Sequence, residues 1–258
     1  MKPGTLYLIQ ASLASPKAKA SDLGHVIPAE VSAITAGLTY FIAENAKSAR
    51  AHLMEVSKSH ELKLPLQQIH FAELNLKRGK DALPELLEPL LAGTDCGLIS
   101  QAGVPVVADP GADLIMAAHD LGIAVVPLVG PSSILLALMA SGLSGQNFAF
   151  NGYLPVRPAD RSRQIRLFES RSRAEMQTQI FMETPYRNHA LLEALCAGLR
   201  DNTRLCVAID LSLPTESVRT QPVSQWKNAL AQKKIPDFQG RPAVFLFLAS
   251  KGQVPQNP

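Results

Sequence analysis

The chain has few cysteines and no long apolar run, and these absences exclude several classes of protein. Its 258 residues include three cysteines, Cys96, Cys196 and Cys206, and no two of them form a CxxC pair. Each lies in an apolar context, which is typical of buried, reduced thiols in a cytoplasmic protein. No apolar run reaches the roughly 18 residues that a membrane-spanning helix needs. The six histidines show no ligand spacing with cysteine or carboxylate, so we expect no metal site and no membrane partner.

The beginning of the chain also lacks the marks of a secretory signal. The first ten residues, MKPGTLYLIQ, enter a strand-like run directly, without an apolar h-region or a cleavage site. We therefore expect a cytoplasmic protein. A hydrophobic content of 47% and a charged content of 18% are typical of a globular protein with one large or two smaller domains.

Strand-like and helical patterns alternate along the first part of the chain. The strand-like runs are residues 5–10, 39–43, 97–100 and 123–127, and the helical runs are 29–36, 46–56, 83–91, 112–121 and 133–140. Such an alternation predicts a largely parallel sheet covered by helices. We assign residues 1–151 to this first α/β domain.

The pattern is interrupted over residues 152–158 by Gly152, Pro155 and Pro158, where we place a linker. Beyond it, strand-like runs at 179–183, 204–209 and 243–248 accompany a polar extended stretch at 215–220 and helical runs at 188–199 and 223–233. Consecutive strands separated by polar stretches predict a mixed sheet. Residues 159–250 are therefore expected to form a second α/β domain.

Two turns rich in glycine and proline follow apolar runs of the first domain. The first includes Val104-Pro105 and Asp109-Pro110-Gly111, and the second is Gly130-Pro131-Ser132-Ser133. In an open α/β sheet, ligands bind beyond the carboxyl ends of the strands, where glycine allows a close approach of the backbone. These turns predict a small-molecule site at that edge.

Arginines are concentrated in one segment of the second half. Residues 157–173 carry six arginines against only Asp160 and Glu169; the six are Arg157, Arg161, Arg163, Arg166, Arg171 and Arg173. This density is compatible with a surface that contacts RNA phosphates, above all through Arg161, Arg163 and Arg166. A solvated helix face with a basic loop is the alternative.

Five motifs carry a resemblance to a known family. They are ISQAGVPVVADPG at 99–111, VPLVGPSS at 126–133, ASGL at 140–143, FAFNGYLP at 148–155 and FMETPYR at 181–187. In this order and spacing they resemble the tetrapyrrole methylase superfamily, and more narrowly its ribosomal small-subunit methyltransferase I branch. The resemblance implies two α/β domains, S-adenosylmethionine (SAM) bound between them, and a homodimer. It also implies that the methyl acceptor is a ribose 2′-hydroxyl of 16S ribosomal RNA, in the small ribosomal subunit.

The resemblance further implies which residues contact the cofactor. The set consists of Gln101, Gly103, Val104, Pro105, Val107, Ser132, Ser133, Met182, Ile209, Pro242 and Ala243. Helix capping is the alternative role for Ser132 and Ser133. Ordinary core packing is the alternative for Met182 and Ile209.

The chain departs from the branch in its first half. A TPIGNL loop is replaced by QASLASP at 10–16, Glu-Asp-Thr-Arg by ENAKSAR at 44–50, and an aspartate by Gln101. A hydroxyl nucleophile benefits from a nearby base, and Glu44 and Asp109 are the catalytic candidates. Asp109 could instead cap the following helix, and Glu44 could be an exposed strand-end carboxylate. A methyltransferase acting on a small molecule, and a SAM-binding protein without catalysis, therefore stay open beside the RNA methyltransferase.

Overall fold

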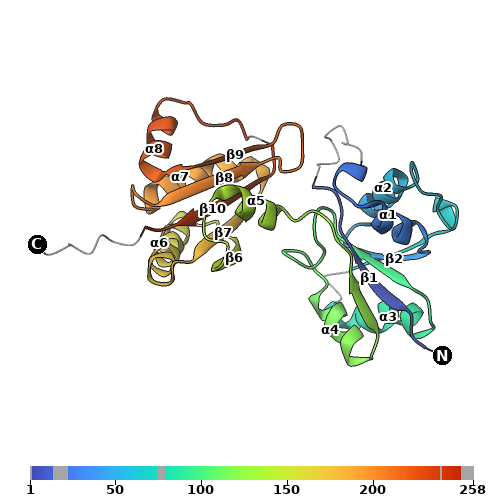
Figure 1. The fold of residues 1–258 in the computed structure, drawn as a ribbon. Helices are drawn as coiled ribbons and strands as arrows, with labels where there is room; N and C mark the ends of the chain where they lie inside the picture. Colours follow the sequence, from blue (N-terminus) through green and yellow to red (C-terminus); the bar gives the residue numbers. More distant parts are fainter. Residues whose placement is uncertain (1, 14–22, 75–78, 239, 251–258) are drawn as a thin grey trace, which may run out of the picture. The chain divides into compact units, whose positions relative to one another are not determined.

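The computed structural model describes residues 2–13, 23–74, 79–238 and 240–250, and it divides into two compact units. The first unit is Met1–Ser132 and the second is Ser133–Pro258 (Figure 1). This division falls before the linker predicted at residues 152–158. The physical reason is that a helix and a strand ahead of that segment pack with the second sheet rather than the first, as described below.

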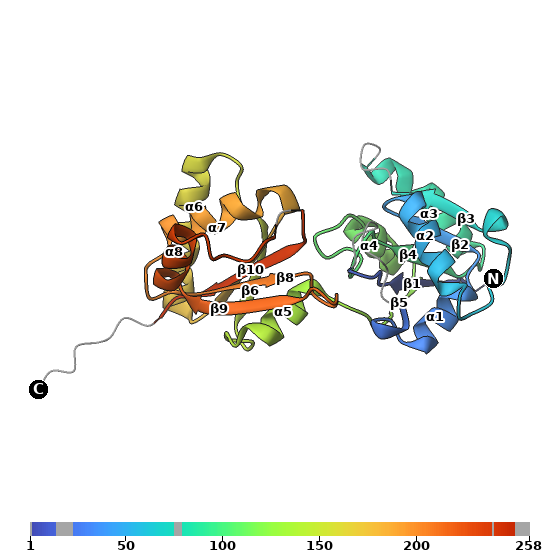
Figure 2. The same ribbon diagram turned by 90° about the horizontal axis from the view of Figure 1, so that it is seen from above.

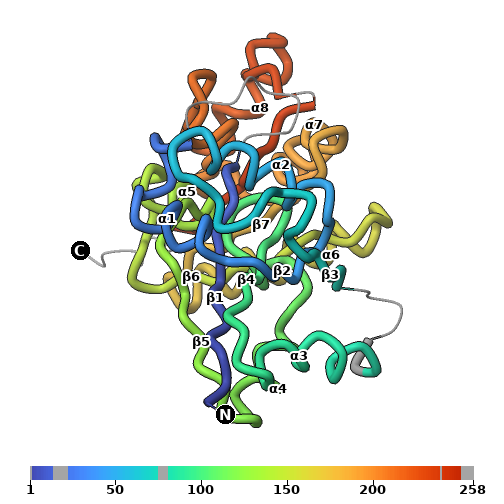
Figure 3. Tube along the Cα trace, turned by 90° about the vertical axis from the view of Figure 1, so that its right-hand side faces the viewer, coloured from blue at the N-terminus to red at the C-terminus, as the bar shows by residue number. Residues whose placement is uncertain are grey.

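The first unit is built on a parallel five-stranded sheet in the order β3-β2-β4-β1-β5. Its strands are β1 (Thr5–Ile9), β2 (Tyr40–Ala43), β3 (His70–Glu73), β4 (Cys96–Ile99) and β5 (Ala124–Pro127). The helices that connect them are α1 (Ala29–Ala36), α2 (Ala46–Val56), α3 (Leu83–Leu91) and α4 (Ala112–Asp120). Figure 3 follows this part of the trace from blue to green.

Both faces of the first sheet are buried, because successive strand residues point to opposite sides. Phe41 packs into a cluster with residues of α1 and α2, whereas the next residue, Ile42, packs into a cluster with residues of α3 and α4. Strands buried on both faces read as continuous apolar runs. The largely parallel sheet that the alternation of strands and helices predicted is confirmed.

The second unit contains a mixed five-stranded sheet in the order β6-β7-β10-β8-β9. Its strands are β6 (Phe148–Tyr153), β7 (Thr178–Glu183), β8 (Arg204–Ile209), β9 (Ser217–Pro222) and β10 (Ala243–Leu248). Only the β6–β7 pair is parallel, so the predicted mixed sheet is also confirmed. The helices are α5 (Ser133–Ser141), α6 (Pro158–Glu175), α7 (Asn188–Gly198) and α8 (Val223–Ala231).

Helices cover the second sheet from two sides. Figure 2 shows α5 on the face opposite α6, α7 and α8. The larger core contains Phe181, Phe245 and Trp226, whose indole Nε1 donates a hydrogen bond to the carbonyl oxygen of Leu205 at 2.8 Å. Because α5 packs on β8, β9 and β10 and β6 pairs with β7, residues 133–153 belong to this unit.

Two strands were missed by the sequence analysis. β3 is short, and none of its side chains is fully buried, so it lacks an apolar run. β6 was recognised only as part of the FAFNGYLP motif, and its Gly152 was assigned to the linker.

The three cysteines are buried, as their apolar surroundings predicted. Burial raises the pKa of Cys96 to about 12 and the pKa values of Cys196 and Cys206 to about 11. Among the described residues, no helix is both long and apolar enough to cross a membrane.

Candidate functional site

The chain topology places a crevice between the carboxyl ends of β1 and β4. From β1 the chain continues to β2, on one side in the sheet order, whereas from β4 it continues to β5, on the other side. Neighbouring strands whose connections leave in opposite directions mark the point where open α/β sheets bind ligands. The loops after these strands meet here, since Ala11 and Gly103 exchange two backbone hydrogen bonds of 2.9 and 3.0 Å.

The loop after β4 has an unusual backbone. Gly103 and Gly111 have φ angles of 68° and 131°, and Val106 and Ala108 have φ angles of 73° and 67°. A β-branched residue such as valine rarely adopts a positive φ, and strain of about 1–3 kcal/mol per residue persists only where the surroundings enforce it. Strained backbone of this kind clusters at ligand sites, which supports the prediction of a binding turn.

The loop after β5 approaches the end of β1 closely. A Cβ atom on Gly130 would lie 2.6 Å from Cβ of Gln10, so no larger residue fits there without a shift. Glycine is therefore required for close approach.

Gln10 itself was not predicted as a site residue. Its side chain is 6% exposed, and its Oε1 accepts no hydrogen bond from the residues that the structure describes. A buried acceptor without a donor costs about 1–3 kcal/mol. The signal in the sequence was a glutamine placed directly after the apolar run of β1, where a buried strand reaches the binding edge.

Glu44 follows β2 and lies beside the loop after β4. Its carboxylate accepts hydrogen bonds from the backbone amide of Gln101 at 3.3 Å and from its side-chain Nε2 at 2.8 Å. The structure thus brings together one predicted catalytic residue and one predicted cofactor contact. Glu44 is half-buried and hydrogen-bonded to Gln101, and its catalytic role stays a prediction.

Asp109 is the second carboxyl group at this edge. Its pKa is raised to about 6, chiefly by partial burial and also by the nearby Glu44 carboxylate, while a hydrogen bond with Ser100 opposes the shift. Asp109 lines a cavity of about 290 Å³ together with Leu74, Leu86 and neighbouring residues. The N-cap residue of α4 is Gly111 and not Asp109, and the catalytic role of Asp109 stays a prediction.

The remaining predicted contacts of the first unit surround this loop. Pro105 is buried, Val104 is half-buried, and Val107 is 47% exposed. Ser132 is the last residue of the first unit, whereas Ser133 is the first residue of α5 in the second unit.

The predicted contacts of the second unit gather at one end of its sheet. Ala243 opens β10 and is paired with the last residues of β7 and β8, Glu183 and Ile209. Ile209 and Ala243 belong to the hydrophobic core, which supports ordinary packing for their side chains. Met182 is half-buried, and the carbonyl oxygen of Pro242 accepts a hydrogen bond from the Asp210 amide at 3.0 Å.

Five of the six clustered arginines lie in α6, and three of these five are engaged in ion pairs. Arg163 pairs with Asp160 at 2.5 Å, Arg171 with Glu175 at 3.2 Å, and Arg173 with Glu169 at 3.8 Å. Arg161 and Arg166 lie about 140° apart around the helix. Arg161 is half-buried, whereas Arg163 and Arg166 are exposed, so the three predicted arginines do not form one surface.

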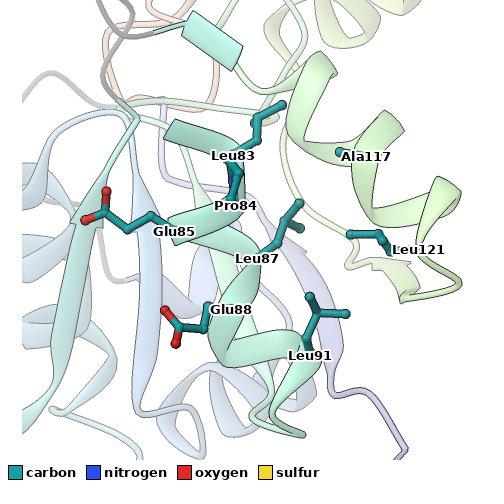
Figure 4. Close-up of a pocket in the computed structure, with 8 residues that line it drawn as sticks. All are labelled: Leu83, Pro84, Glu85, Leu87, Glu88, Leu91, Ala117 and Leu121. Atoms are coloured by element: carbon teal, nitrogen blue, oxygen red, sulfur yellow. The ribbon is translucent and has the colours of Figure 1, made fainter. Parts of the chain in front are cut away.

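A groove of about 700 Å³ lies elsewhere, between α3 and α4, and contains none of the predicted site residues. Figure 4 shows Leu83, Leu87 and Leu91 directed toward α4, while Glu85 and Glu88 point away from it. Across the described part of the chain, no group of three or more His, Cys, Asp or Glu side chains is arranged to hold a metal ion.

Comparison with known proteins identifies the family. Residues 34–226 match the profile described as Tetrapyrrole (Corrin/Porphyrin) Methylases, and the chain belongs to this family. Two similar proteins are both named ribosomal RNA small subunit methyltransferase I. The one from Pseudomonas aeruginosa is 39% identical over 53% of this chain and 47% of its own length. The one from Xylella fastidiosa is 32% identical over 72% of this chain and 60% of its own length. The chain thus spans about half the length of the curated relatives it matches.

Solved structures agree on the fold. A conserved hypothetical protein from Aeropyrum pernix K1 aligns with a TM-score of 0.60 and 16% identity, over 98% of this chain and 86% of that one. The methyltransferase CobJ aligns with a TM-score of 0.57 and 15% identity, over 96% and 100%. At such identities the likeness concerns the fold alone.

Proposed function

We propose that this protein is a SAM-dependent methyltransferase that modifies a ribose 2′-hydroxyl of small-subunit ribosomal RNA. The observation that carries the proposal is the match, at 32–40% identity, to proteins named ribosomal RNA small subunit methyltransferase I. The strained loop at the switch point of the first sheet supports it, because open α/β sheets bind ligands at such a point.

The residues at this edge fit a dipolar nucleoside cofactor. Its amino, hydroxyl and adenine groups are hydrogen-bond donors, and Gln10 Oε1 is a buried acceptor without a donor. Gly103, Val104, Pro105, Val107 and Ser132 would hold the cofactor from the first unit, with Gln101 oriented by Glu44. From the second unit the proposed contacts are Ser133, Met182, Ile209, Pro242 and Ala243. When bound, SAM supplies a methyl group already activated by its sulfonium.

Asp109 is suited to accept the proton of the acceptor hydroxyl. A pKa of about 6 leaves its carboxyl ionised at neutral pH, and a base is more effective when its pKa lies near the working pH. Glu44 lies close enough to raise that pKa, and it holds Gln101 through two hydrogen bonds. We therefore assign proton acceptance to Asp109 and the positioning of the loop after β4 to Glu44.

Transfer of a labelled methyl group from SAM into small ribosomal subunits tests this proposal. We expect incorporation by the wild type, and a loss of about 100-fold or more in Asp109→Asn, which is typical for removal of a general base. Asp120→Asn is the control, since Asp120 is an exposed carboxylate at the end of α4. Absence of incorporation by a wild type that binds SAM would contradict the RNA acceptor.

One observation favours a second candidate, a methyltransferase of the same fold acting on a small molecule. Gln101 stands where the resembled branch has an aspartate, and its side-chain amide donates a hydrogen bond to the Glu44 carboxylate. The hydrogen-bonding groups offered to the methyl acceptor therefore differ from those of the branch. Label recovered in small molecules of a cell extract, and not in RNA, would favour this function. SAM binding without transfer to either would indicate lost catalysis.

We also propose that the protein is a cytoplasmic homodimer. Within α5, Ile134, Ala137 and Leu138 are buried in their own unit, whereas Leu135 and Met139 are 56% and 77% exposed. The edge strand β5 has no fully buried side chain, although its sequence is AVVP. Exposed apolar surfaces of this kind are typical of interfaces.

A further inference from the structure

A second pocket, unrelated to the predicted residues, lies in the second unit. It measures about 390 Å³, within the range of roughly 300–1,000 Å³ for small-molecule sites. Its lining is Pro185, Tyr186, His189, Ile235, Pro236, Asp237 and Phe238, so three of its seven members carry an aromatic ring. One wall is the short turn before α7 and the other is the loop after α8.

Tyr186 projects from a rigid turn. Its side chain is 77% exposed, although the neighbouring Arg187 and Glu183 fix the backbone beneath it. Arg187 donates hydrogen bonds to Glu183 Oε1 from Nε at 3.0 Å and from Nη2 at 2.6 Å, and the Thr184 amide donates to the same oxygen at 2.7 Å. The Glu183 side chain is 2% exposed, so this ion pair anchors the turn to the core. The backbone that carries the ring is therefore fixed before any ligand binds, and the Arg187 guanidinium lies 5.9 Å from the ring centroid.

The opposite wall is also fixed. Asn188 Nδ2 donates to the carbonyl oxygen of Arg241 at 2.8 Å, and Arg241 donates to Asp210 Oδ2 and to the carbonyl oxygen of Asp237, both at 2.6 Å. Phe238 is buried in the hydrophobic core at the base of the loop. A preformed pocket loses little conformational entropy on binding.

The chemistry of the lining selects a planar, polar ligand. The Tyr186 ring offers a stacking surface, and the Asp237 carboxylate offers an acceptor for ring or exocyclic N–H groups. Lys233 and Lys234 are exposed and directly precede Ile235, which lines the pocket. Exposed aromatic rings beside lysines are typical of single-stranded nucleic-acid sites.

We propose that this pocket binds one unstacked nucleobase of a single-stranded RNA segment, with Tyr186 stacking on the base and Lys233 and Lys234 contacting phosphates. The proposal rests on the proposed RNA substrate and adds to it a base-binding site in the second unit. In this proposal the pocket binds and orients the RNA, whereas methyl transfer takes place at the switch point of the first sheet.

Binding of a fluorescent oligoadenylate of about ten nucleotides tests the pocket, measured by anisotropy with the full chain. We expect Tyr186→Ala to weaken binding about 10-fold and Tyr186→Trp to preserve it, because base stacking is lost only in the first. Tyr153→Ala is the matched control, since Tyr153 is also exposed, at 51%, but lies on the edge strand β6. Lys233→Gln with Lys234→Gln should lower the salt dependence of binding.

Three results would overturn the base pocket. The first is equal affinity of Tyr186→Ala and the wild type. The second is an equal loss in Tyr153→Ala. The third is full-strength binding of adenosine monophosphate with no gain from linked nucleotides, which would indicate a mononucleotide site. Thermal shift with SAM, run on the same proteins, separates this outcome from failure of the proposed function, because Tyr186 lies outside the proposed SAM contacts.

Discussion

Asp109 and Glu44 are two carboxyl groups at one edge of a sheet, and their environments differ. Glu44 accepts two hydrogen bonds from Gln101, whereas partial burial and the Glu44 carboxylate raise the pKa of Asp109 to about 6. A carboxyl group whose surroundings raise its pKa toward neutrality is typical of sites that use it for proton transfer. The raised pKa also has a consequence for stability.

We expect Asp109→Asn to stabilise the folded protein at neutral and higher pH. The folded pKa of about 6 lies above the unfolded value of about 3.9, so the folded state holds the proton more tightly. Stability from this group is therefore present below about pH 4 and is lost as the pH rises through about 6. Asparagine does not ionise, so the variant does not lose this stability as the pH rises. Urea unfolding should show it more stable by about 1 kcal/mol near pH 8, after allowance for partial exposure, with no difference near pH 4. A difference that does not vary with pH would contradict this account.

Gln10 offers a test of whether its unpaired acceptor serves a ligand. Methionine has a similar shape and no amide, so Gln10→Met removes a buried Oε1 that has no donor among the described residues. We expect a gain of about 1 kcal/mol in the free energy of unfolding without SAM. We also expect SAM affinity to fall about 10-fold, the value of one lost hydrogen bond. Calorimetry and denaturant unfolding measure the two effects, and a variant that binds SAM as tightly as the wild type would exclude Gln10 as a contact.

At the scale of elements, the loop after β5 depends on its glycine. Gly130→Ala would place a Cβ 2.6 Å from Cβ of Gln10, and relief requires a shift of backbone. We expect a loss of about 1–3 kcal/mol in stability, as for overpacked sites, together with weaker SAM binding. Gly145→Ala is the matched control, because nothing lies within 4 Å of its added Cβ. Equal melting temperatures for the two variants would show that the loop after β5 accommodates the added Cβ without a loss of stability.

Salt dependence of RNA binding tests the arginines of α6. Arg163 and Arg166 lie on the exposed side of the helix, so we expect their joint replacement by glutamine to flatten the salt slope of RNA binding. Adding Arg161→Gln should change little more, since that side chain lies about 140° from Arg166. SAM affinity should stay the same. An unchanged slope in the double variant would assign RNA contacts elsewhere.

The elements were predictable wherever a local pattern decides them. The helix Ala46–Val56 has an amphipathic spacing, and the buried strand Ala243–Leu248 is a continuous apolar run. β3 has neither, because it lies at the edge of the sheet. The pairing of Ala11 with Gly103 joins loops far apart in sequence, so no local pattern could indicate it. Tyr186 was missed for the same reason, because its importance lies in what surrounds it in space.

At the scale of the whole molecule, the division between the units was predicted too late in the chain. Proline and glycine at residues 152–158 marked a real interruption, but α5 and β6 precede it and belong to the second unit. Helix α5 is apolar over much of its surface, and the sequence could not tell which sheet it would cover. In the structure α5 packs on β8, β9 and β10, which assigns it to the second unit.

Light scattering tests the proposed dimer. Because Leu135 and Met139 are exposed on α5, and β5 is an apolar edge strand, we expect a particle of twice the 27.8 kDa mass of one chain. Met139→Lys should weaken association through the cost of burying a charge, with little effect on unit stability, since that side chain is 77% exposed. A mass near 27.8 kDa across micromolar concentrations would contradict the proposed homodimer.

The three cysteines make the native protein a convenient background for chemical labelling. Thiolates, not thiols, react with maleimides and iodoacetamide, and burial raises all three pKa values to about 11 or 12. A cysteine introduced at the exposed Ala102 or His189 would therefore be the one reactive thiol, without removal of the natural ones. A dye attached at Ala102 would report on the loop after β4, and one at His189 on the base pocket. Each proposed ligand could thus be followed by its own signal in an otherwise unaltered chain.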